Sequence, residues 1–138
     1  MKIEEIEQQI IEEFNAFDEW MDKYAYLIEL GNDCPMIDIK DKVPENLIQG
    51  CQSNVWVSAK MVDGLMDIKA DSDAVITKGI ISLLLRVFNH QRPEDIYAAN
   101  LKFIDEIGLS SHLSPTRSNG LVSMIKQIKA YALAFSRK

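Results

Sequence analysis

Cysteine, histidine and positive charge are all scarce in this chain. Its 138 residues include two cysteines and two histidines, and 21 acidic residues outnumber 15 basic ones. A net charge of −6 leaves no excess of Lys and Arg for phosphate groups, so we expect no general binding to nucleic acid. Two cysteines cannot form a dense disulfide framework, and we expect Cys34 and Cys51 to be free thiols in a reducing compartment.

Long apolar runs are also absent. The longest, residues 80–85, is far shorter than the roughly 20 residues that span a bilayer. The first ten residues alternate acids with isoleucines, which is unlike a signal peptide. We therefore expect a cytoplasmic protein without membrane association. Because no repeats or Pro/Gly-rich linkers interrupt the chain, we expect residues 1–138 to form a single domain.

Helical periodicity marks the N-terminal part of the chain. Apolar residues recur every three or four positions over 3–17 and again over 21–28. Asp18 is a candidate N-cap of the second helix, and Gly31 is a candidate C-cap. Residues 32–49 lose all periodicity and contain two prolines, so they predict a long loop.

The C-terminal half is also predicted to be helical. Residues 74–89 are apolar nearly all round, which indicates a central buried helix, and Asp71, Ser72 or Asp73 could cap it. Residues 100–113 mix short helical turns with loop. The last helix begins with a Ser-Pro pair at 114–115, which is typical of a helix start.

The clearest local signal is a β-hairpin around Asp63-Gly64. Apolar and polar residues alternate on both sides of this dipeptide, which favours a two-residue type I′ turn. The turn fixes a register whose expected pairs are Met61–Met66, Ala59–Ile68, Val57–Ala70, Lys60–Asp67 and, by extension, Asn54–Asp73. Trp56 interrupts the polar face, so we expect that face to be partly covered. Helices, a hairpin and more helices predict an α+β fold, with a small antiparallel sheet packed against several helices.

This register places Cys51 just beyond the end of the hairpin, near the start of the 74–89 helix. The positive end of a helix dipole lowers the pKa of a thiol, but the carboxylates of Asp71 and Asp73 are expected nearby and oppose thiolate formation. We therefore expect only a modest lowering of the Cys51 pKa. From the residues alone, Cys51 is equally well described as a small buried hydrophobic side chain or as a functional thiol.

Two further kinds of site can be weighed from spacing. A zinc site is disfavoured, because neither the cysteines nor His90 and His112 have the short spacing of zinc ligands, and we expect no metal. A cysteine hydrolase would pair Cys51 with His90 or His112. Such nucleophiles usually lie at a helix start beside an oxyanion hole, whereas Cys51 leads into a strand. Cys34, before Pro35, has no supporting neighbours.

Three separated segments carry a family resemblance: IQGCQSNVWV (48–57), DSDAVITKGI (71–80) and GLSSHLSPTRSNGLVSMI (108–125). Together with KYAYLIELG (23–31), they resemble the SufE family of sulfur-acceptor proteins, which includes the CsdE branch. The resemblance extends over nearly the whole chain. It implies a SufE/IscU-like fold and a role in iron–sulfur cluster assembly.

The resemblance also implies a reaction and its partners. A pyridoxal-phosphate cysteine desulfurase, of the SufS or CsdA type, would hold sulfur as a persulfide and turn over faster with this chain present. Cys51 would take that sulfur by transpersulfuration and pass it to a scaffold complex of the SufBCD type. Pyridoxal phosphate and clusters would belong to the partners, so this chain should need no cofactor. A free-standing cysteine-dependent enzyme, either a hydrolase or a thiol transferase, remains the alternative. We expect a monomer or a weak homodimer.

Neighbours of the thiol have expected roles as well. Gly50 would give the loop the backbone freedom to swing Cys51 toward a partner, and Gln52 and Ser53 could form hydrogen bonds around the sulfur. Arg117 is expected to pair with a carboxylate near the loop or to contact the desulfurase. The candidates for the partner interface, or for orientation, are Asp71, Asp73 and Arg117.

Overall fold

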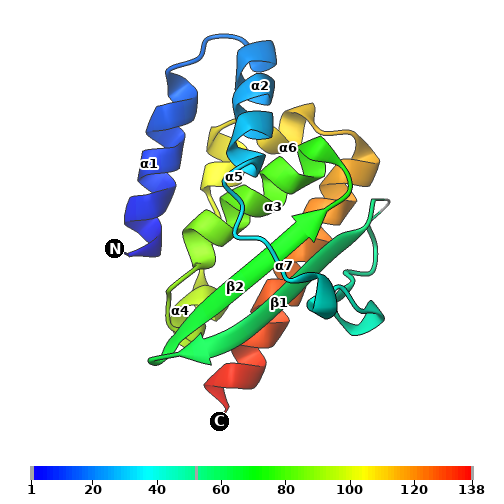
Figure 1. Cartoon of the computed structure of the whole chain (residues 1–138). Helices are drawn as coiled ribbons and strands as arrows, with labels where there is room; N and C mark the ends of the chain where they lie inside the picture. Colours follow the sequence, from blue (N-terminus) through cyan, green and yellow to red (C-terminus); the bar gives the residue numbers. More distant parts are fainter. Residues whose placement is uncertain (1, 52, 138) are drawn as a thin grey trace.

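The α+β prediction is confirmed by a computed structural model, which describes residues 2–51 and 53–137 (Figure 1). The one hairpin of the described residues is flanked by helices on both sides in the sequence. In chain order, the described elements are α1 (Ile3–Asn15), α2 (Trp20–Gly31), the 3-10 turns η1 (Ile39–Asp41) and η2 (Pro44–Asn46), β1 (Val55–Val62), β2 (Leu65–Ser72), α3 (Val75–Phe88), α4 (Pro93–Ala98), α5 (Phe103–Glu106), α6 (Leu109–His112) and α7 (Pro115–Ser136).

The hairpin has the predicted register. The Cα partners include Met61 and Met66, Lys60 and Asp67, Ala59 and Ile68, and Val57 and Ala70. Asp63 and Gly64 both have positive φ, as a type I′ turn requires. Beyond the strands, the Asp73 carboxylate accepts hydrogen bonds from the backbone N–H of Asn54 at 3.1 Å and from its side-chain amide at 3.0 Å. The predicted contact between Asn54 and Asp73 is therefore present.

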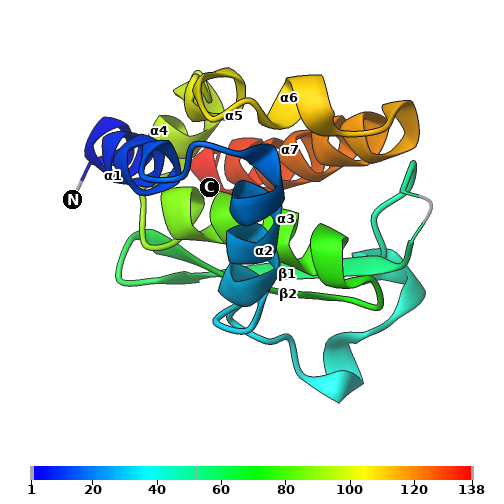
Figure 2. The same cartoon turned by 90° about the horizontal axis from the view of Figure 1, so that it is seen from above.

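The helices lie on one side of the hairpin, with α3 and α7 between it and the short helices (Figure 2). Leu84, Leu85 and Phe88 of α3 are each at most 1% exposed. Burial of one such side chain stabilises the fold by about 1.5–3 kcal/mol. The Tyr131 hydroxyl of α7 donates a hydrogen bond to the Val57 carbonyl oxygen at 3.2 Å. The prediction of a central buried helix is confirmed, and α7 is tied directly to β1.

Helices α2 and α3 cross with their backbones in contact. A Cβ atom on Gly79 would collide with the carbonyl oxygen of Leu27, and one on Gly31 would lie 3.1 Å from the Gly79 nitrogen. Two glycines therefore allow the close approach of these helices. The start of α2 differs slightly from the prediction, because the helix begins after Glu19 rather than Asp18.

The start of α3 also differs from the prediction. Ala74 occupies the N-cap position, and its side chain cannot accept a hydrogen bond. Ser72 Oγ accepts from the Ala74 N–H at 3.2 Å, just before the helix. Asp71 and Asp73 do not cap α3, because Asp71 forms ion pairs with two lysines and Asp73 binds Asn54. These carboxylates stabilise the hairpin end instead.

The segment between α2 and β1 folds back over the hairpin (Figure 1). Met36 forms an isolated bridge with Ala70, and Leu47 forms one with Trp56. The Lys42 ammonium lies 5.1 Å from the centroid of the Trp56 ring, a cation–π contact. The Trp56 face is therefore partly covered, as the broken alternation predicted.

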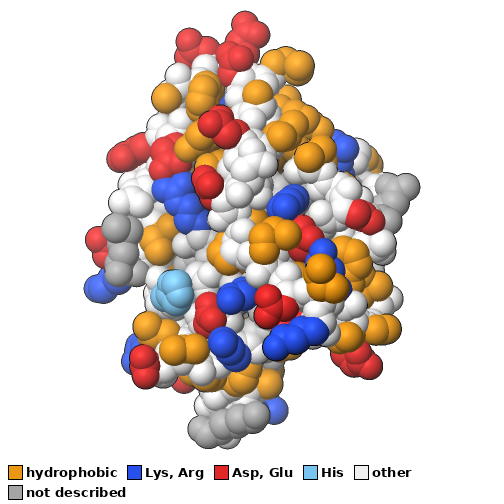
Figure 3. Space-filling view, viewed as in Figure 1, with side chains coloured by type: hydrophobic (Ala, Val, Ile, Leu, Met, Phe, Trp, Pro, Cys, Tyr) orange, Lys and Arg blue, Asp and Glu red, His pale blue; other side chains and the backbone are white. Residues whose placement is uncertain are grey.

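Charged side chains of both signs are mixed on the face of the molecule that Figure 3 draws. On the face drawn in Figure 3, basic and acidic side chains are interspersed with apolar ones, and no wide area of one sign is visible. Within residues 2–51 and 53–137, no helix is both long and apolar enough to cross a membrane.

Candidate functional site

Cys51 faces a small hollow of about 100 Å³ between the N-terminal parts of α3 and α7. Ala74, Thr77 and Ile80 come from the α3 side, and Thr116, Arg117 and Gly120 come from α7. The predicted position of Cys51, near the start of α3, is confirmed. The structure adds α7 as the second wall.

The Cys51 thiol is half-buried at this hollow. Its Sγ lies 3.7 Å from the carbonyl oxygen of Gly120, within reach of a weak S–H···O hydrogen bond. Burial raises the pKa of the Cys51 thiol. This is opposite to the modest lowering that we predicted from the α3 dipole, because removal from water disfavours the thiolate. At neutral pH, the resting thiol is therefore protonated.

Gly50 holds the loop in a conformation that only glycine adopts readily. Its φ is +92°, and an added Cβ would lie 2.5 Å from the Ser123 Oγ on α7. Ser53 lines the hollow, and its predicted hydrogen bond near the sulfur stays a prediction. Gln52 lies outside the described residues. The role of Gly50 as a hinge stays a prediction.

Arg117 is brought to the hollow by the first turn of α7. Its Nη1 donates a hydrogen bond to the hydroxyl of Tyr24 on α2 at 3.0 Å, and its backbone N–H donates to Ser114 Oγ at 3.3 Å. The prediction of a carboxylate partner is wrong for the described residues, since this guanidinium binds a phenol. Of the described residues that line the hollow, Arg117 is the charged one.

Asp71 is a buried carboxylate that pairs with two partly exposed lysines, and it is not among the described residues that line the hollow. Its carboxylate lies 2.5 Å from Lys42 Nζ and 3.4 Å from Lys78 Nζ, and it accepts from the Ser72 N–H at 2.8 Å. Burial disfavours the charge, but these donors together hold the pKa of Asp71 below its usual value. Asp71 thus ties the loop to α3, while an interface role for Asp73 stays a prediction.

The two histidines have other surroundings, and neither is among the described residues that line the hollow. The His112 ring stacks on Trp20 with centroids 4.2 Å apart, and its Nδ1 lies 2.8 Å from the Gly108 carbonyl oxygen. His90 follows α3 with a φ of +60°, and its Nε2 lies 3.9 Å from the Asp67 carboxylate. The structure therefore does not support a Cys–His pair at the hollow.

Cys34, the second thiol, lies in the core. It is 5% exposed, its Sγ is 3.7 Å from the Ala70 carbonyl oxygen, and burial raises its pKa to about 11. Cys34 is therefore a small buried hydrophobic side chain. Across residues 2–51 and 53–137, no group of three or more His, Cys, Asp or Glu side chains is arranged to hold a metal ion.

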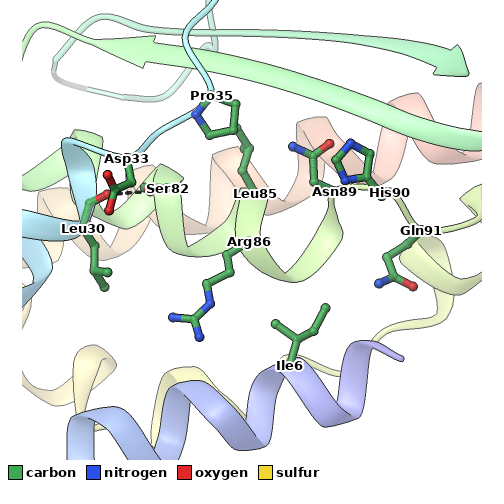
Figure 4. A pocket seen from close by; sticks show the side chains of 10 residues that line it. All are labelled: Ile6, Leu30, Asp33, Pro35, Ser82, Leu85, Arg86, Asn89, His90 and Gln91. Carbon is green, nitrogen blue, oxygen red and sulfur yellow. Dashed lines mark hydrogen bonds between the residues drawn. The ribbon is translucent and has the colours of Figure 1, made fainter. Parts of the chain in front are cut away.

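A larger hollow of about 580 Å³ lies between α1 and α3 and contains no thiol among its described lining residues (Figure 4). Arg86 points from α3 toward α1, where it pairs with Glu13. The Ser82 hydroxyl donates to the Leu30 carbonyl oxygen at 2.9 Å, and the Asn89 side chain binds the backbone of β2. Because these polar groups are already paired, we place the candidate site at Cys51.

Sequence reasoning missed Gly120 and Tyr24 as parts of the site. Gly120 follows Thr116 by four positions in a helix, so it shares the face that Thr116 presents to the hollow. That spacing could have identified it. Tyr24 reaches Arg117 only through the packing of α2 near the start of α7, for which no local signal exists.

Comparisons with known proteins agree with this architecture. A family model described as "SufE: Fe-S metabolism associated domain" matches residues 8–132. The chain is also similar to a solution structure described as a hypothetical protein from Thermus thermophilus. That match has a TM-score of 0.80 at 19% identity and covers 96% of this chain and 97% of the other. At this identity, the second likeness supports the fold alone.

Proposed function

Because the chain belongs to the SufE family and its domain is associated with Fe–S metabolism, we propose that Cys51 is a sulfur acceptor for a cysteine desulfurase in iron–sulfur cluster assembly. One observation carries the proposal. The thiol lies in the loop just before β1, half-buried at a small hollow that has room beside the sulfur. A thiol that receives and then releases sulfur must be reachable by its partners, and its persulfide must be protected from reductants and oxidants in solution.

The transfer is an exchange between a thiol and a persulfide. The Cys51 sulfur attacks the outer sulfur of the partner's persulfide anion, and a new S–S bond forms as the old one breaks. The partner's inner sulfur leaves with the electron pair and takes the proton from Cys51. The products are a Cys51 persulfide anion and a partner thiol. Since one S–S bond replaces another, the step needs no external oxidant or reductant.

We extend the proposal to the partners. The donor is a pyridoxal-phosphate desulfurase of the SufS or CsdA type, and the recipient is a scaffold complex of the SufBCD type, in the cytoplasm. Pyridoxal phosphate and the assembling cluster belong to those proteins, so this chain needs neither of its own. Removing the sulfur frees the desulfurase cysteine for another turnover, which accounts for activation.

A free-standing cysteine hydrolase or thiol transferase has less support. A hydrolase needs a base beside the nucleophile, and neither His90 nor His112 is among the described lining residues. Burial also raises the pKa of Cys51, whereas a self-sufficient cysteine enzyme benefits from a lowered one. A partner that displaces the loop would expose the Cys51 thiol to water and so remove the burial that raises its pKa.

Intact mass spectrometry tests the proposal directly. After incubation with a desulfurase and free cysteine, we expect the chain to gain the mass of one sulfur atom. Cys51→Ser should abolish the gain, and the matched Cys34→Ser variant should keep it, because Cys34 lies in the core. No gain in the wild-type chain with any desulfurase of the proposed types would contradict the proposal. Turnover of a small ester or disulfide by the chain alone would favour the alternative.

A further inference from the structure

The charged residue at the Cys51 hollow, Arg117, has no carboxylate partner among the described residues. The Cys51 pKa is shifted by burial, so the resting thiol is neutral and needs no counter-ion. Nevertheless, Arg117 lines the same hollow, with its guanidinium held by the Tyr24 hydroxyl at 3.0 Å. A cation at the wall of a hollow that also holds a neutral thiol suits a ligand that arrives later and carries a negative charge.

We propose that this hollow binds the transferred sulfur as a persulfide anion, with the Arg117 guanidinium as its counter-ion and Tyr24 as the residue that positions Arg117. The inference rests on the proposed function. It adds where the sulfur is held, in which charge state, and by which side chains.

The hollow has suitable dimensions for one added sulfur. The outer sulfur of a persulfide lies about 2.05 Å from Sγ. The hollow of about 100 Å³ exceeds the roughly 30 Å³ that one water molecule occupies in the liquid. Gly120 keeps a methyl group away from the sulfur, since an added Cβ there would be in van der Waals contact with Sγ at 3.5 Å. The hydroxyl-bearing side chains of Thr77 and Thr116 also line this space.

The surrounding charges leave Arg117 available. Asp71 is paired with Lys42 and Lys78, and Asp73 accepts two hydrogen bonds from Asn54. The hydrogen bonds of the Arg117 side chain and backbone go to the neutral hydroxyls of Tyr24 and Ser114. A persulfide is more acidic than the parent thiol, and a nearby guanidinium favours the anionic form further.

Tyr24 is well placed to hold the guanidinium. Its ring packs edge-on against Trp20 with centroids 6.4 Å apart, and Trp20 stacks on His112 at 4.2 Å. These contacts link the Tyr24 ring through Trp20 to His112 of α6, and the Tyr24 hydroxyl restricts the positions of the long Arg117 side chain. Tyr24 therefore acts through Arg117 and does not touch the sulfur itself.

A chemically loaded protein tests this inference without a desulfurase. Inorganic polysulfide supplies the sulfur: the Cys51 thiolate attacks one polysulfide sulfur and releases a shorter polysulfide. The Cys34→Ser background restricts loading to Cys51. Alkylation by iodoacetamide, followed by intact mass spectrometry across pH, then gives the apparent pKa of the persulfide and, in unloaded protein, that of the thiol.

Four variants separate charge from structure. Arg117→Gln should raise the persulfide pKa by about 0.5 unit or more, and Tyr24→Phe should raise it by less. Arg117→Lys keeps the cation and should restore most of the wild-type value. Arg92→Gln, which removes an exposed arginine paired with Asp95, should change nothing. In protein without the added sulfur, the pH dependence of Cys51 alkylation should be the same in all four variants, because burial governs the pKa of the Cys51 thiol.

Each result decides the inference. An unchanged persulfide pKa in Arg117→Gln would overturn it, as would equal shifts for persulfide and thiol, which would indicate a general structural effect. Failure of wild-type Cys51 to hold the added sulfur would also overturn it. If Arg117→Gln does not fold, Tyr24→Phe carries the test, since it should still raise the persulfide pKa and leave the thiol pKa unchanged. Loss of desulfurase-dependent loading with an intact Arg117 effect would refute the proposed function alone.

Discussion

Substitution of Gly50 by alanine should destabilise the loop that carries Cys51. A non-glycine residue at φ +92° costs about 1–2 kcal/mol. The new Cβ would also lie 2.5 Å from Ser123 Oγ, so the serine must rotate and lose its 3.1 Å hydrogen bond to the Asn119 carbonyl oxygen. A lost hydrogen bond of this kind costs about 1 kcal/mol. We therefore expect Gly50→Ala to lower the free energy of unfolding by about 2–3 kcal/mol.

A double-mutant cycle with Ser123→Ala separates these two contributions. The Ser123 Cβ is 3.5 Å from the position of the new methyl group, which is an ordinary contact. In the Ser123→Ala background, Gly50→Ala should therefore cost only the backbone strain, about 1–2 kcal/mol. The expected coupling between the two positions is about 1 kcal/mol.

Urea unfolding of the wild type, the two single variants and the double variant measures the four unfolding free energies of the cycle. The rate of Cys51 alkylation shows whether the strain is relieved by local opening of the loop. If the loop opens locally instead of straining the whole fold, the loss of stability will be smaller but iodoacetamide will react faster with Cys51. Unchanged unfolding together with unchanged alkylation in Gly50→Ala would refute the reasoning. Additive effects of the two substitutions would refute the contact with Ser123 alone.

Three further predictions concern the ion pairs, the helix crossing and the thiols. Asp71→Asn should cost about 2–3 kcal/mol at pH 7, because it leaves two lysines without their carboxylate. The pKa of Asp71 is lowered in the folded protein, so the difference in unfolding free energy is fully present above the unfolded pKa of about 3.9. It should shrink as the pH falls from there through the lower pKa of the folded state. Urea unfolding of both proteins at pH 7 and pH 3 measures this change. Gly79→Ala should lower the thermal midpoint by several degrees, because the new methyl group meets the backbone of Leu27; an unchanged midpoint would contradict the close crossing of α2 and α3. In the protein without a partner, alkylation of Cys51 should be slow at pH 7 and accelerate only above about pH 8.5, because its pKa is raised. Alkylation of the buried Cys34 should be slower still. Fast reaction of Cys51 at pH 7 would show that its pKa is lowered rather than raised.

The hairpin could be predicted residue by residue because its information is local. Asp63-Gly64 specifies the turn, the turn specifies the register, and the register places Asn54 opposite Asp73. The position of Cys51 beside α3 follows from the same chain of reasoning. The boundaries of α3 and α7 were also close to the prediction, since a Ser-Pro start and an apolar stripe are short-range patterns.

The electrostatics of the site could not be predicted in this way. Asp71 was one of three candidates for the cap of α3, but Lys42 from the preceding loop reaches its carboxylate, and no spacing rule relates those two positions. Arg117 was expected to pair with a carboxylate or to contact the desulfurase; within the described residues its guanidinium binds Tyr24 of α2, and the contact with the desulfurase stays a prediction. The Cys51 pKa shifts upward because α7 covers the thiol, and that wall exists only in the folded chain.

The Lys42 contact with Trp56 also gives the protein an internal optical signal. The ammonium lies 5.1 Å from the indole centroid and belongs to the segment that leads to Cys51. Release of that segment would expose the indole to water and change its fluorescence emission. The chain has one other tryptophan, Trp20, on α2, so Trp20→Phe isolates the Trp56 signal. The Trp56 emission thus tests, without any attached dye, whether this segment moves when a partner is added.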